Sequence, residues 1–463
     1  MQKLFDEVGS LDKRCYDEFG LSEDILMEHA ANGMAEYIRV NFKRDSKILI
    51  VCGSGNNGAD GMALARVLHV EYEVCMFYVK EPKSPMAILQ NSRAHSIGLK
   101  VAIELNECDV IVDAVYGTGF RGEFHYEAKA VMQTLNRSNA FKIACDIPSG
   151  INSDGQCEKD TFVADISLTM GALKKSMFLD EAKEFVGEIK VLDLGINRDI
   201  YETKSSWNLL DKEDMRLPYR TKKNSHKGTY GHLALTCGEK SGASVMSAIA
   251  ALKFGSGLVT LVGFKELNTP NSIMHSHILP SNTTALAIGM GLGDEFSAVE
   301  LDTFLDNSLP LIADADIFNM KIIGTILERE NSVITPHPKE FVELLKRVGI
   351  ADINVEELQK NRFKYVEIFC KKYLHVTLLL KGSNVIIGRG GEFFINTFGT
   401  QSLAKGGSGD VLSGLVGALL AQGYEVLDAT ITASLAHTSL VNNYKGADFS
   451  LTPEDLIAGI GNL

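Results

Sequence analysis

The densest group of residues that could do chemistry lies at positions 406–410, where Gly-Gly-Ser-Gly-Asp precedes an apolar run of helical length. Glycine leaves backbone N–H groups uncovered, and a helix that begins there adds the positive end of its dipole, so the segment predicts an anion site. Asp410 would lie in the first helical turn, ionised at neutral pH and able to accept a proton from a hydroxyl. The alternative is a tight turn in which Asp410 only caps the helix.

Two further segments of the second half carry candidate site residues. The sequence Lys-Gly-Ser-Asn-Val at 381–385 follows a buried strand pattern and offers a cation with free backbone donors to a nucleotide phosphate. A plain turn is the competing explanation. His337 lies between two prolines on a stiff loop, where a structural histidine is the competing interpretation.

In the first half, oxygen-bearing side chains follow three different strand patterns, at Asn57, Asp113 and Ser149. Oxygen ligands without Cys or His suit a hard cation, and a single carboxylate favours a monovalent one. The alternative is that each residue caps a turn or a helix, which is common for these residue types.

Two other features of the first half could act on a ligand. Asp146 ends an apolar strand pattern and could be a general acid or base, although a structural hydrogen bond would explain it nearly as well. The glycine-rich segment 117–123 resembles a loop that cradles a phosphate, with Arg121 available to pair with charge. Glycine-rich loops of this length are common in other roles.

Length and charge limit the class of protein. A chain of 463 residues exceeds one ordinary core, so we expect two domains, and 45% hydrophobic with 23% charged residues is typical of a globular protein. Lys and Arg total 46 against 59 Asp and Glu, for a net charge of −13. This balance argues against nucleic-acid or anionic-membrane binding, so a phosphorylated ligand must be held by local pockets.

The cysteines and the apolar segments indicate the compartment. The eight cysteines are scattered without a Cys-x-x-Cys pair, which favours free thiols in a reducing cytoplasm over disulfides or zinc. The N-terminus has acids and no apolar signal core, and the longest apolar stretches are too short to span a bilayer. We therefore expect a cytoplasmic protein.

The spacing of apolar residues predicts alternating strands and helices in the first half, with a glycine loop at 53–61 between the first strand and its helix. This alternation indicates an α/β domain, a Rossmann-like parallel sheet with helices on both faces, whose ligands bind at the carboxyl ends of the strands. Asn56 and Asn57 exclude the usual dinucleotide fingerprint. We expect helices at 21–42, 85–97 and 126–135, and strands at 47–52, 73–79, 109–115 and 141–145.

A second alternating series begins after a polar stretch, so we place the domain boundary near Ser205, with domains at 1–205 and 206–463. The series includes a helix at 243–254 and a probable hairpin at 385–388 and 392–396. The remaining expected strands are 232–236, 258–262, 284–288, 310–313, 332–335 and 377–380.

Taken in order, the motifs resemble those of a known family. Asn-Asn-Gly-Ala-Asp-Gly at 56–61, Asp-Ala-Val-Tyr-Gly-Thr-Gly at 113–119 and Asp-Ile-Pro-Ser-Gly at 146–150 resemble the NAD(P)H-hydrate epimerase domain. The second half resembles the ADP/ATP-dependent NAD(P)H-hydrate dehydratase domain, a ribokinase-like α/β sandwich. Its motifs here are 226–232, 289–293, Thr-Pro-His-Pro at 335–338, Leu-Lys-Gly at 380–382 and 403–412. The fused pair is similar to bifunctional NAD(P)H-hydrate repair enzymes.

The resemblance implies a repair activity. The first domain would interconvert the R and S hydrates of NADH and NADPH, and the second would dehydrate the S form with ADP, which gives AMP and phosphate. The chemistry suits the opening segment, because water leaves the ring poorly whereas a phosphorylated hydroxyl leaves easily. Asp410 would take the hydroxyl proton while glycine N–H groups stabilise the phosphoryl charge.

The resemblance also implies site residues, with Asp146 and Asp410 catalytic. K+ would be held by Asn57, Asp113 and Ser149, and Mg²⁺ would accompany the nucleotide. The hydrate would contact Asn56, Asn57, Gly58, Ala59, Asp60, Gly117, Thr118, Gly119, Phe120, Arg121, Gly122, Glu123 and Asp146 in the first domain. In the second domain it would contact Ala243, Gly291, His337 and Asp410, and the adenine nucleotide would contact Lys381, Gly382, Ser383, Asn384, Val385 and Gly409. We expect a homo-oligomer.

Three positions depart from the family pattern. Ala59 replaces a glycine, Lys339 replaces the glycine after the Thr-Pro-His-Pro loop, and Thr400-Gln-Ser402 stands where Asn-Pro is usual. Ala59 is tolerated only if its φ is negative. Two rival functions remain: a ribokinase-like kinase of a small hydroxyl compound, and a first domain that only binds a nucleotide or partner.

Overall fold

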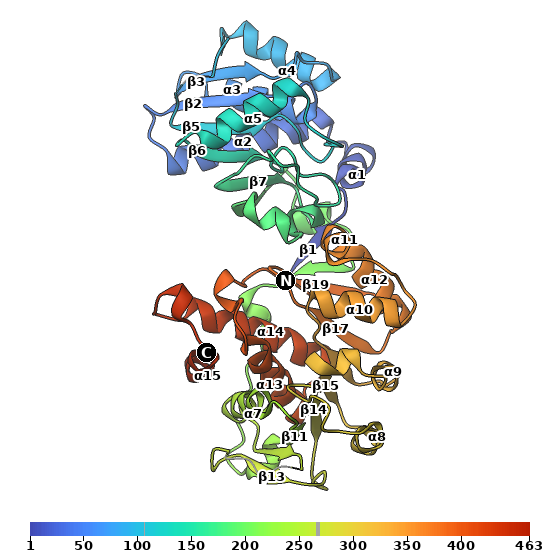
Figure 1. The fold of residues 1–463 in the computed structure, drawn as a ribbon. Helices are drawn as coiled ribbons and strands as arrows, with labels where there is room; N and C mark the ends of the chain where they lie inside the picture. The colour runs from blue at the N-terminus through green and yellow to red at the C-terminus, as the bar shows by residue number, and fades with distance from the viewer. Residues whose placement is uncertain (106, 265–268) are drawn as a thin grey trace. The chain divides into compact units, whose positions relative to one another are not determined.

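The computed structural model describes residues 1–105, 107–264 and 269–463, whose contacts separate the chain into two compact units. One unit is Lys3–Trp207, and the other is Asn208–Leu463 together with Met1–Gln2. Each unit has its own buried core, and most strands of each sheet belong to one unit (Figure 1).

The first unit is built on a parallel sheet with the strand order β4-β3-β2-β5-β6-β7-β9. Successive residues of a strand point to opposite faces, and β2 shows this directly. Ile48 and Ile50 join the core formed with α2, α3 and α4, whereas Leu49 and Val51 join the core formed with α5. The predicted parallel sheet with helices on both faces is therefore confirmed.

The elements of this half are β1 (Gln2–Phe5), α1 (Gly9–Phe19), α2 (Glu23–Asn41), β2 (Lys47–Cys52), α3 (Asn56–Leu68), β3 (Glu73–Tyr78), α4 (Pro85–Ser96), β4 (Lys100–Val101), β5 (Val110–Ala114), α5 (Tyr126–Arg137), β6 (Phe141–Cys145), β7 (Ile166–Met170), β8 (Leu173–Lys174), β9 (Glu188–Leu192) and α6 (Arg198–Tyr201). The helix expected at 21–42 is two residues shorter at its N-terminus because Ser22 caps it, accepting from the Ile25 N–H.

The turn from β2 into α3 requires its glycines. A Cβ on Gly58 would lie 2.0 Å from the carbonyl oxygen of Gly53, and one on Gly61 would lie 2.6 Å from Cβ of Ala114 on β5. The start of α3 can therefore approach the sheet only without side chains at these positions. Ala59 is a buried helical residue, and its φ is negative, so the alanine that departs from the family pattern fits here.

The second unit has a mixed sheet in which β13-β12-β11-β14-β15-β16-β17 are parallel neighbours and β18 and β19 follow as an antiparallel hairpin. The predicted hairpin is confirmed. Helices α7, α13 and α14 form the core over Leu233, Ile312 and Leu379. Helices α10 and α12 lie on the other side of β17 (Figure 1).

The elements of this half are β10 (Trp207–Leu209), β11 (His232–Thr236), α7 (Ser241–Lys253), β12 (Leu258–Val262), β13 (Met274–Ser276), β14 (Ala285–Ile288), α8 (Ala298–Leu305), β15 (Leu311–Ala313), α9 (Ile323–Leu327), β16 (Ser332–Ile334), α10 (Pro338–Arg347), α11 (Val355–Lys360), α12 (Arg362–Lys372), β17 (Val376–Leu380), β18 (Val385–Arg389), β19 (Glu392–Asn396), α13 (Ser408–Ala421), α14 (Val426–Asn442) and α15 (Pro453–Gly459).

The cysteines and the helices bear on the expected compartment. All eight cysteines carry free thiols, as their scattered spacing predicts. In the described ranges, no helix combines the length and hydropathy that crossing a bilayer requires.

Candidate functional site

The carboxylate of Asp113 and the hydroxyl of Ser149 are in direct contact in the first unit. Asp113 is fully buried at the end of β5, where Ser149 donates to it from Oγ (2.7 Å) and from its backbone N–H (2.7 Å). Burial raises the pKa of Asp113 to about 6, and the hydrogen bonds from Ser149 oppose that rise. Two of the three residues predicted to hold a cation are thus brought together.

Asn57 is the third of these residues and lies in the first turn of α3. Its Oδ1 faces Gly117, because a Cβ on that glycine would lie 3.3 Å from the oxygen. Its Nδ2 is buried without a hydrogen-bond partner among the described residues. Rotation of the amide would exchange nitrogen for oxygen there, so the set of one carboxylate, one amide and one hydroxyl fits the oxygen ligands of K+.

The Mg²⁺ expected in the second unit has fewer candidate protein ligands than the K+ expected in the first unit. Within the described part of the chain, no group of three or more His, Cys, Asp or Glu side chains could hold a metal ion. A Mg²⁺ ion in the second unit would therefore depend on nucleotide phosphates for ligands, which is its usual mode.

Asp146 has a conformation that a non-glycine residue rarely adopts. Its φ is 72°, and its Oδ1 accepts from Thr169 Oγ1 (3.1 Å) and from the Met170 backbone N–H (3.0 Å). Lys174 Nζ also donates to Oδ1, and this lysine is completely buried. Backbone strain of this kind concentrates at functional sites.

Sequence reasoning missed Lys174. Its ammonium also donates to Thr169 Oγ1 (2.8 Å) and to the Met170 carbonyl (2.9 Å), so all three of its protons have partners. A buried lysine needs such a set of partners, because an unpaired charge in the interior is costly. The signal was a lysine that directly follows 166–173, a segment of apolar and small residues without a charge.

The glycine-rich segment 117–123 is held together by its own arginine. Arg121 Nη1 donates to the carbonyl oxygens of Thr118 (3.0 Å) and Phe120 (2.8 Å). The Phe120 ring is buried against Tyr116 and Phe124, with centroids 5.4 Å and 5.0 Å away. Arg121 therefore closes the loop, and its pairing with a ligand charge stays a prediction.

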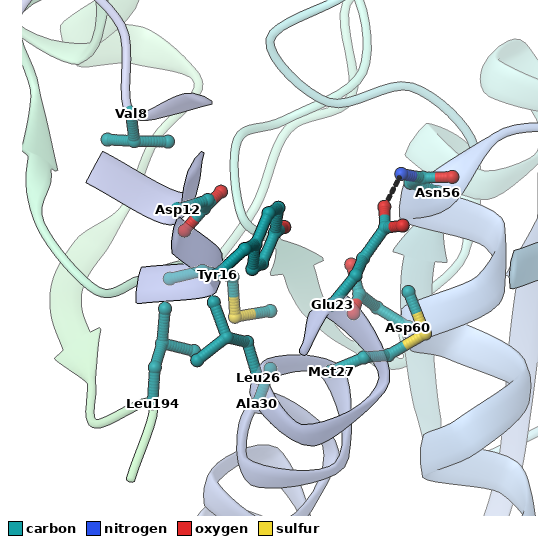
Figure 2. A pocket seen from close by; sticks show the side chains of 11 residues that line it. Val8, Asp12, Tyr16, Glu23, Leu26, Met27, Ala30, Asn56, Asp60 and Leu194 are labelled. Carbon is teal, nitrogen blue, oxygen red and sulfur yellow. Dashed lines mark hydrogen bonds between the residues drawn. The ribbon is translucent and has the colours of Figure 1, made fainter. Parts of the chain in front are cut away.

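A cavity of about 110 Å³ opens beside Asn56 and Asp60, two of the predicted substrate contacts (Figure 2). Burial and the carboxylate of Asp146 raise the pKa of Asp60 well above its usual range. Asn56 Nδ2 donates to Glu23 Oε1 at 2.5 Å. The full lining is Val8, Asp12, Tyr16, Glu23, Leu26, Met27, Ala30, Asn56, Asp60, Met170 and Leu194.

In the second unit, an ion pair links the ends of β15 and β17. Lys381 Nζ donates to Oδ1 of the buried Asp314 (2.7 Å), whose Oδ2 accepts from Ser413 on α13 (2.8 Å). A Cβ on Gly409 would lie 3.3 Å from Lys381 Nζ. The segments 381–385 and 406–410, which were predicted separately, therefore meet at the start of α13. Asp314 is a site residue that sequence reasoning missed.

Asp410 lies in the first turn of α13, as predicted. Burial raises its pKa to about 6, the nearby carboxylate of Asp314 adds to the rise, and Lys381 opposes it. The helix begins at Ser408, directly after Gly407, whose φ of 90° suits glycine, and its start has no side-chain cap. Among the described residues, none donates a hydrogen bond to the Asp410 carboxylate, so it is not acting as a helix cap.

His337 has a structural role at the start of α10. Its Nδ1 accepts from the Glu340 N–H (3.2 Å), and its own N–H donates to Glu340 Oε2 (2.8 Å), which forms a reciprocal capping box. Burial lowers the pKa of His337, and burial raises that of Glu340 to about 7. Lys339 leaves this box intact, which explains why the departure from glycine is tolerated.

Gly291 and Ala243, two of the predicted hydrate contacts, lie near the same helix start. Gly291 has a φ of 64°, and a Cβ there would lie 2.3 Å from the Lys240 carbonyl oxygen and 3.1 Å from Cβ of Ala243. Ser247 on α7 donates to the Asp410 carbonyl oxygen (2.7 Å) and to that of Ala243 (3.1 Å). The hydrate-contact candidates of the second domain thus surround one end of its sheet.

Known proteins resemble this chain over its whole length. A family model described as NAD(P)H-hydrate dehydratase matches residues 233–460, and one described as YjeF-related protein N-terminus matches residues 23–176. The bifunctional NAD(P)H-hydrate repair enzyme of Helicobacter pylori is 43% identical and covers 100% of both chains. That of Dictyoglomus turgidum is 31% identical over 98% of this chain and 96% of its own.

Solved structures resemble slightly more than half of this chain. The ADP/ATP-dependent NAD(P)H-hydrate dehydratase of Bacillus subtilis, co-crystallised with ATP/Mg²⁺, is 25% identical, with a TM-score of 0.47, and covers 55% of this chain and 96% of its own. A ribokinase-like superfamily protein of Enterococcus faecalis V583 is 22% identical, with a TM-score of 0.48 over 56% of this chain and 96% of its own.

Proposed function

Since the chain belongs to the family of bifunctional NAD(P)H-hydrate repair enzymes, we propose that its two units catalyse the two steps of that repair. We assign the epimerase to residues 1–205 and the dehydratase to residues 206–463. The observation that supports the proposal is the group formed by Asp410, Gly409 and the Lys381–Asp314 pair, in which we assign the base to Asp410 and the anion site to the neighbouring glycine N–H groups.

The epimerase exchanges the R and S hydrates at the ring carbon that bears the hydroxyl. The ring nitrogen can expel a protonated hydroxyl as water, and water can add back to either face of the ring. One group that gives and then removes a proton is therefore sufficient, and Asp146 is that group. Lys174 holds Asp146 in its strained conformation and supplies a positive charge next to it.

We assign the K+ site to Asn57, Asp113 and Ser149, with the fit of the oxygen ligands as support. The ion would supply a fixed positive charge at the carboxyl ends of β2, β5 and β6. The proposed contacts of the hydrate are the residues of 56–60, of 117–123 and Asp146.

The dehydratase acts on the hydroxyl of the S hydrate. Asp410 removes the hydroxyl proton as the oxygen attacks the terminal phosphate of ADP, and AMP leaves. Backbone N–H groups of 407–410 stabilise the phosphoryl charge. The ring nitrogen then expels phosphate, and loss of a proton from the neighbouring carbon restores NAD(P)H. The Mg²⁺ that accompanies the nucleotide would neutralise phosphate charge.

Three further assignments concern the compartment, the nucleotide and the assembly. We propose a cytoplasmic location from the free thiols, and ADP as the preferred nucleotide from the family. We also propose a homo-oligomer. The substrate contacts of the second domain are Ala243, Gly291 and His337, and those of the nucleotide are residues 381–385 with Gly409.

The deciding experiment supplies the purified chain with the S hydrate of NADH and ADP. The proposal predicts that absorbance of the reduced nicotinamide returns while AMP and phosphate accumulate in equal amounts. A hydroxyl kinase would instead accumulate a stable phosphorylated product. No recovery of absorbance with either ADP or ATP would overturn the dehydratase assignment.

A further inference from the structure

The cavity beside Asn56 and Asp60 is lined in part by a helix outside the region that the family model of the first unit matches. That match begins at residue 23, whereas Val8, Asp12 and Tyr16 on or next to α1 line the cavity. Figure 2 shows Tyr16 between Asp12 on one side and Glu23 and Asp60 on the other. Helix α1 therefore contributes a wall to a space that the predicted substrate residues share.

The cavity adjoins the proposed catalytic group. Met170 is one of its lining residues, and the backbone N–H of Met170 donates to Asp146 Oδ1 at 3.0 Å. The electrostatic neighbours of Asp60 include Asp146, Asp12, Lys174 and Glu23. A group bound in the cavity would thus lie next to the atoms that act on the ring.

The size of the cavity limits what it can receive. Its volume of about 110 Å³ far exceeds the roughly 10–15 Å³ that one water molecule requires. Pockets that enclose a whole drug-sized ligand usually measure about 300–1,000 Å³. The cavity therefore fits one end of the substrate and not the complete dinucleotide.

The chemistry of the lining limits the group further. Leu26, Met27, Ala30 and Leu194 provide apolar walls, and the polar side chains are two amphiprotic groups and carboxyls rather than cations. A phosphate or a carboxylate would find no cationic side chain in this lining and is excluded. A neutral, flat group that both donates and accepts hydrogen bonds fits, and the carboxamide on the nicotinamide ring is such a group.

Resting on the epimerase function proposed above, we propose that Asp12 and Tyr16 form, with Asp60, the subsite that receives the carboxamide of the hydrated nicotinamide ring. The subsite fixes which edge of the ring faces Asp146. Asp12 accepts a hydrogen bond from the amide NH₂. Tyr16 and Asp60 form hydrogen bonds with the other N–H and the carbonyl oxygen of the amide.

Two structural details support these roles. Tyr201, which is 1% exposed, donates from Oη to Asp12 Oδ1 at 2.7 Å and holds that carboxyl in place from outside the cavity lining. Burial raises the pKa of both Asp12 and Asp60, and the other carboxylates add to the rise at Asp60. A protonated carboxyl at Asp60 donates and accepts at once, which matches an amide.

The test compares two substrates on the full chain. One is the R hydrate of NADH, and the other is the R hydrate of an NADH analogue whose carboxamide is replaced by an acetyl group, which keeps the carbonyl and lacks N–H donors. Epimerisation is measured directly by separating the R and S forms. The variants are Asp12→Asn, Tyr16→Phe and the control Asp17→Asn, which removes a charge from an exposed position of the same helix.

We expect the wild-type chain to use the acetyl analogue with a kcat/KM lower by about 10-fold or more. Asp12→Asn should raise KM for the amide substrate by a similar factor and reduce the preference for the amide substrate over the acetyl analogue. The Asn side chain can still accept from Tyr201, but it no longer offers a carboxylate to the ligand NH₂. Asp17→Asn should behave as wild type. Tyr16→Phe removes a single hydroxyl from a partly exposed ring, so it tests the subsite even if Asp12→Asn folds poorly.

Equal use of the two substrates by the wild-type chain would overturn the subsite, as would variants that slow both substrates equally. Denaturant unfolding of the same preparations reports whether the first unit is folded. A wild-type chain with no epimerisation at all would instead refute the proposed epimerase function. The inference alone would be refuted if Asp146→Asn were inactive while Asp12→Asn and Tyr16→Phe used both substrates as the wild-type chain does. The epimerase function would then stand without the subsite.

Discussion

Lys381 Nζ donates to Asp314 Oδ1 at 2.7 Å, and the other oxygen of Asp314 accepts from Ser413 on α13. This contact joins the ends of two strands to the helix that carries Asp410. It also places a second carboxylate close enough to Asp410 to raise the pKa of that residue. The protonation of the proposed base is therefore set partly by a neighbour that makes no contact with its carboxyl group.

Asp314→Asn should shift the pH dependence of dehydration. The pKa of Asp410 is about 6, so kcat/KM should rise with pH through that value as the carboxylate forms. Removal of the Asp314 charge lowers the pKa of Asp410, and the freed Lys381 lowers it further. The rising limb of the pH profile should move to lower pH, and a limb that stays in place or moves upward would contradict this electrostatic coupling.

Asp113→Asn should change how stability depends on pH. The folded pKa of Asp113, about 6, lies above its ordinary value of 3.8. Its contribution to stability is therefore complete below pH 3.8 and is lost as the pH rises through 6. The wild-type chain should lose up to about 3 kcal/mol from this group between those limits. Denaturant unfolding at several pH values should show a smaller loss in the variant.

From the Asp113 carboxylate we also expect a specific effect of potassium on the melting temperature. Above pH 6 the ionised Asp113 needs a counter-charge, so KCl should raise the melting temperature more than choline chloride at equal ionic strength. Asp113→Asn should remove most of that difference. Equal stabilisation by the two salts in the wild-type chain would contradict the K+ assignment.

Lys174→Met should abolish epimerisation while dehydration of the S hydrate continues. The change leaves Asp146 without its buried partner, and breaking such a pair typically costs about 3–5 kcal/mol. Asp146 would then lose the partner that holds it in its strained conformation. Lys159→Met, at an exposed position of the same unit, is the matched control. Retention of full epimerase activity by Lys174→Met would show that Asp146 functions without the lysine.

Ala59→Gly should destabilise the chain by about 1 kcal/mol without affecting epimerisation. Ala59 is a buried residue in the helix interior with a negative φ, where glycine costs backbone entropy and leaves space behind. Denaturant unfolding and the R-to-S rate measure the two effects. A faster R-to-S rate in the variant would mean that the glycine usual in this family serves catalysis.

Much of the fold follows from local pattern. Apolar runs such as 47–52 and 232–236 are strands with the predicted limits, because buried strands of a parallel sheet are continuously apolar. The helix at 243–254 instead begins at Ser241. Helix starts are harder to predict than strands, because they depend on caps and loop contacts as well as on the apolar period.

The site was predictable where a strand ends in a polar or glycine residue. Asp113, Ser149, Asp146, Gly409 and Asp410 are in the places that such strand ends and helix starts predict. Lys174, Asp314 and the α1 residues were missed, because their roles depend on partners distant in sequence. In the sequence Asp314 does not differ from other strand-end residues, because its partner Lys381 lies 67 positions away.

The most direct test of the central claim is the Asp410→Asn variant of the full chain, assayed with the S hydrate of NADH and ADP. Removal of the base should slow recovery of NADH by about 10²- to 10⁴-fold, since that is the usual contribution of a general base. ADP binding measured by calorimetry and R-to-S epimerisation should both remain as in the wild-type chain. A recovery rate within a factor of two of wild type would contradict the account, because Asp410 would then take no proton in the reaction.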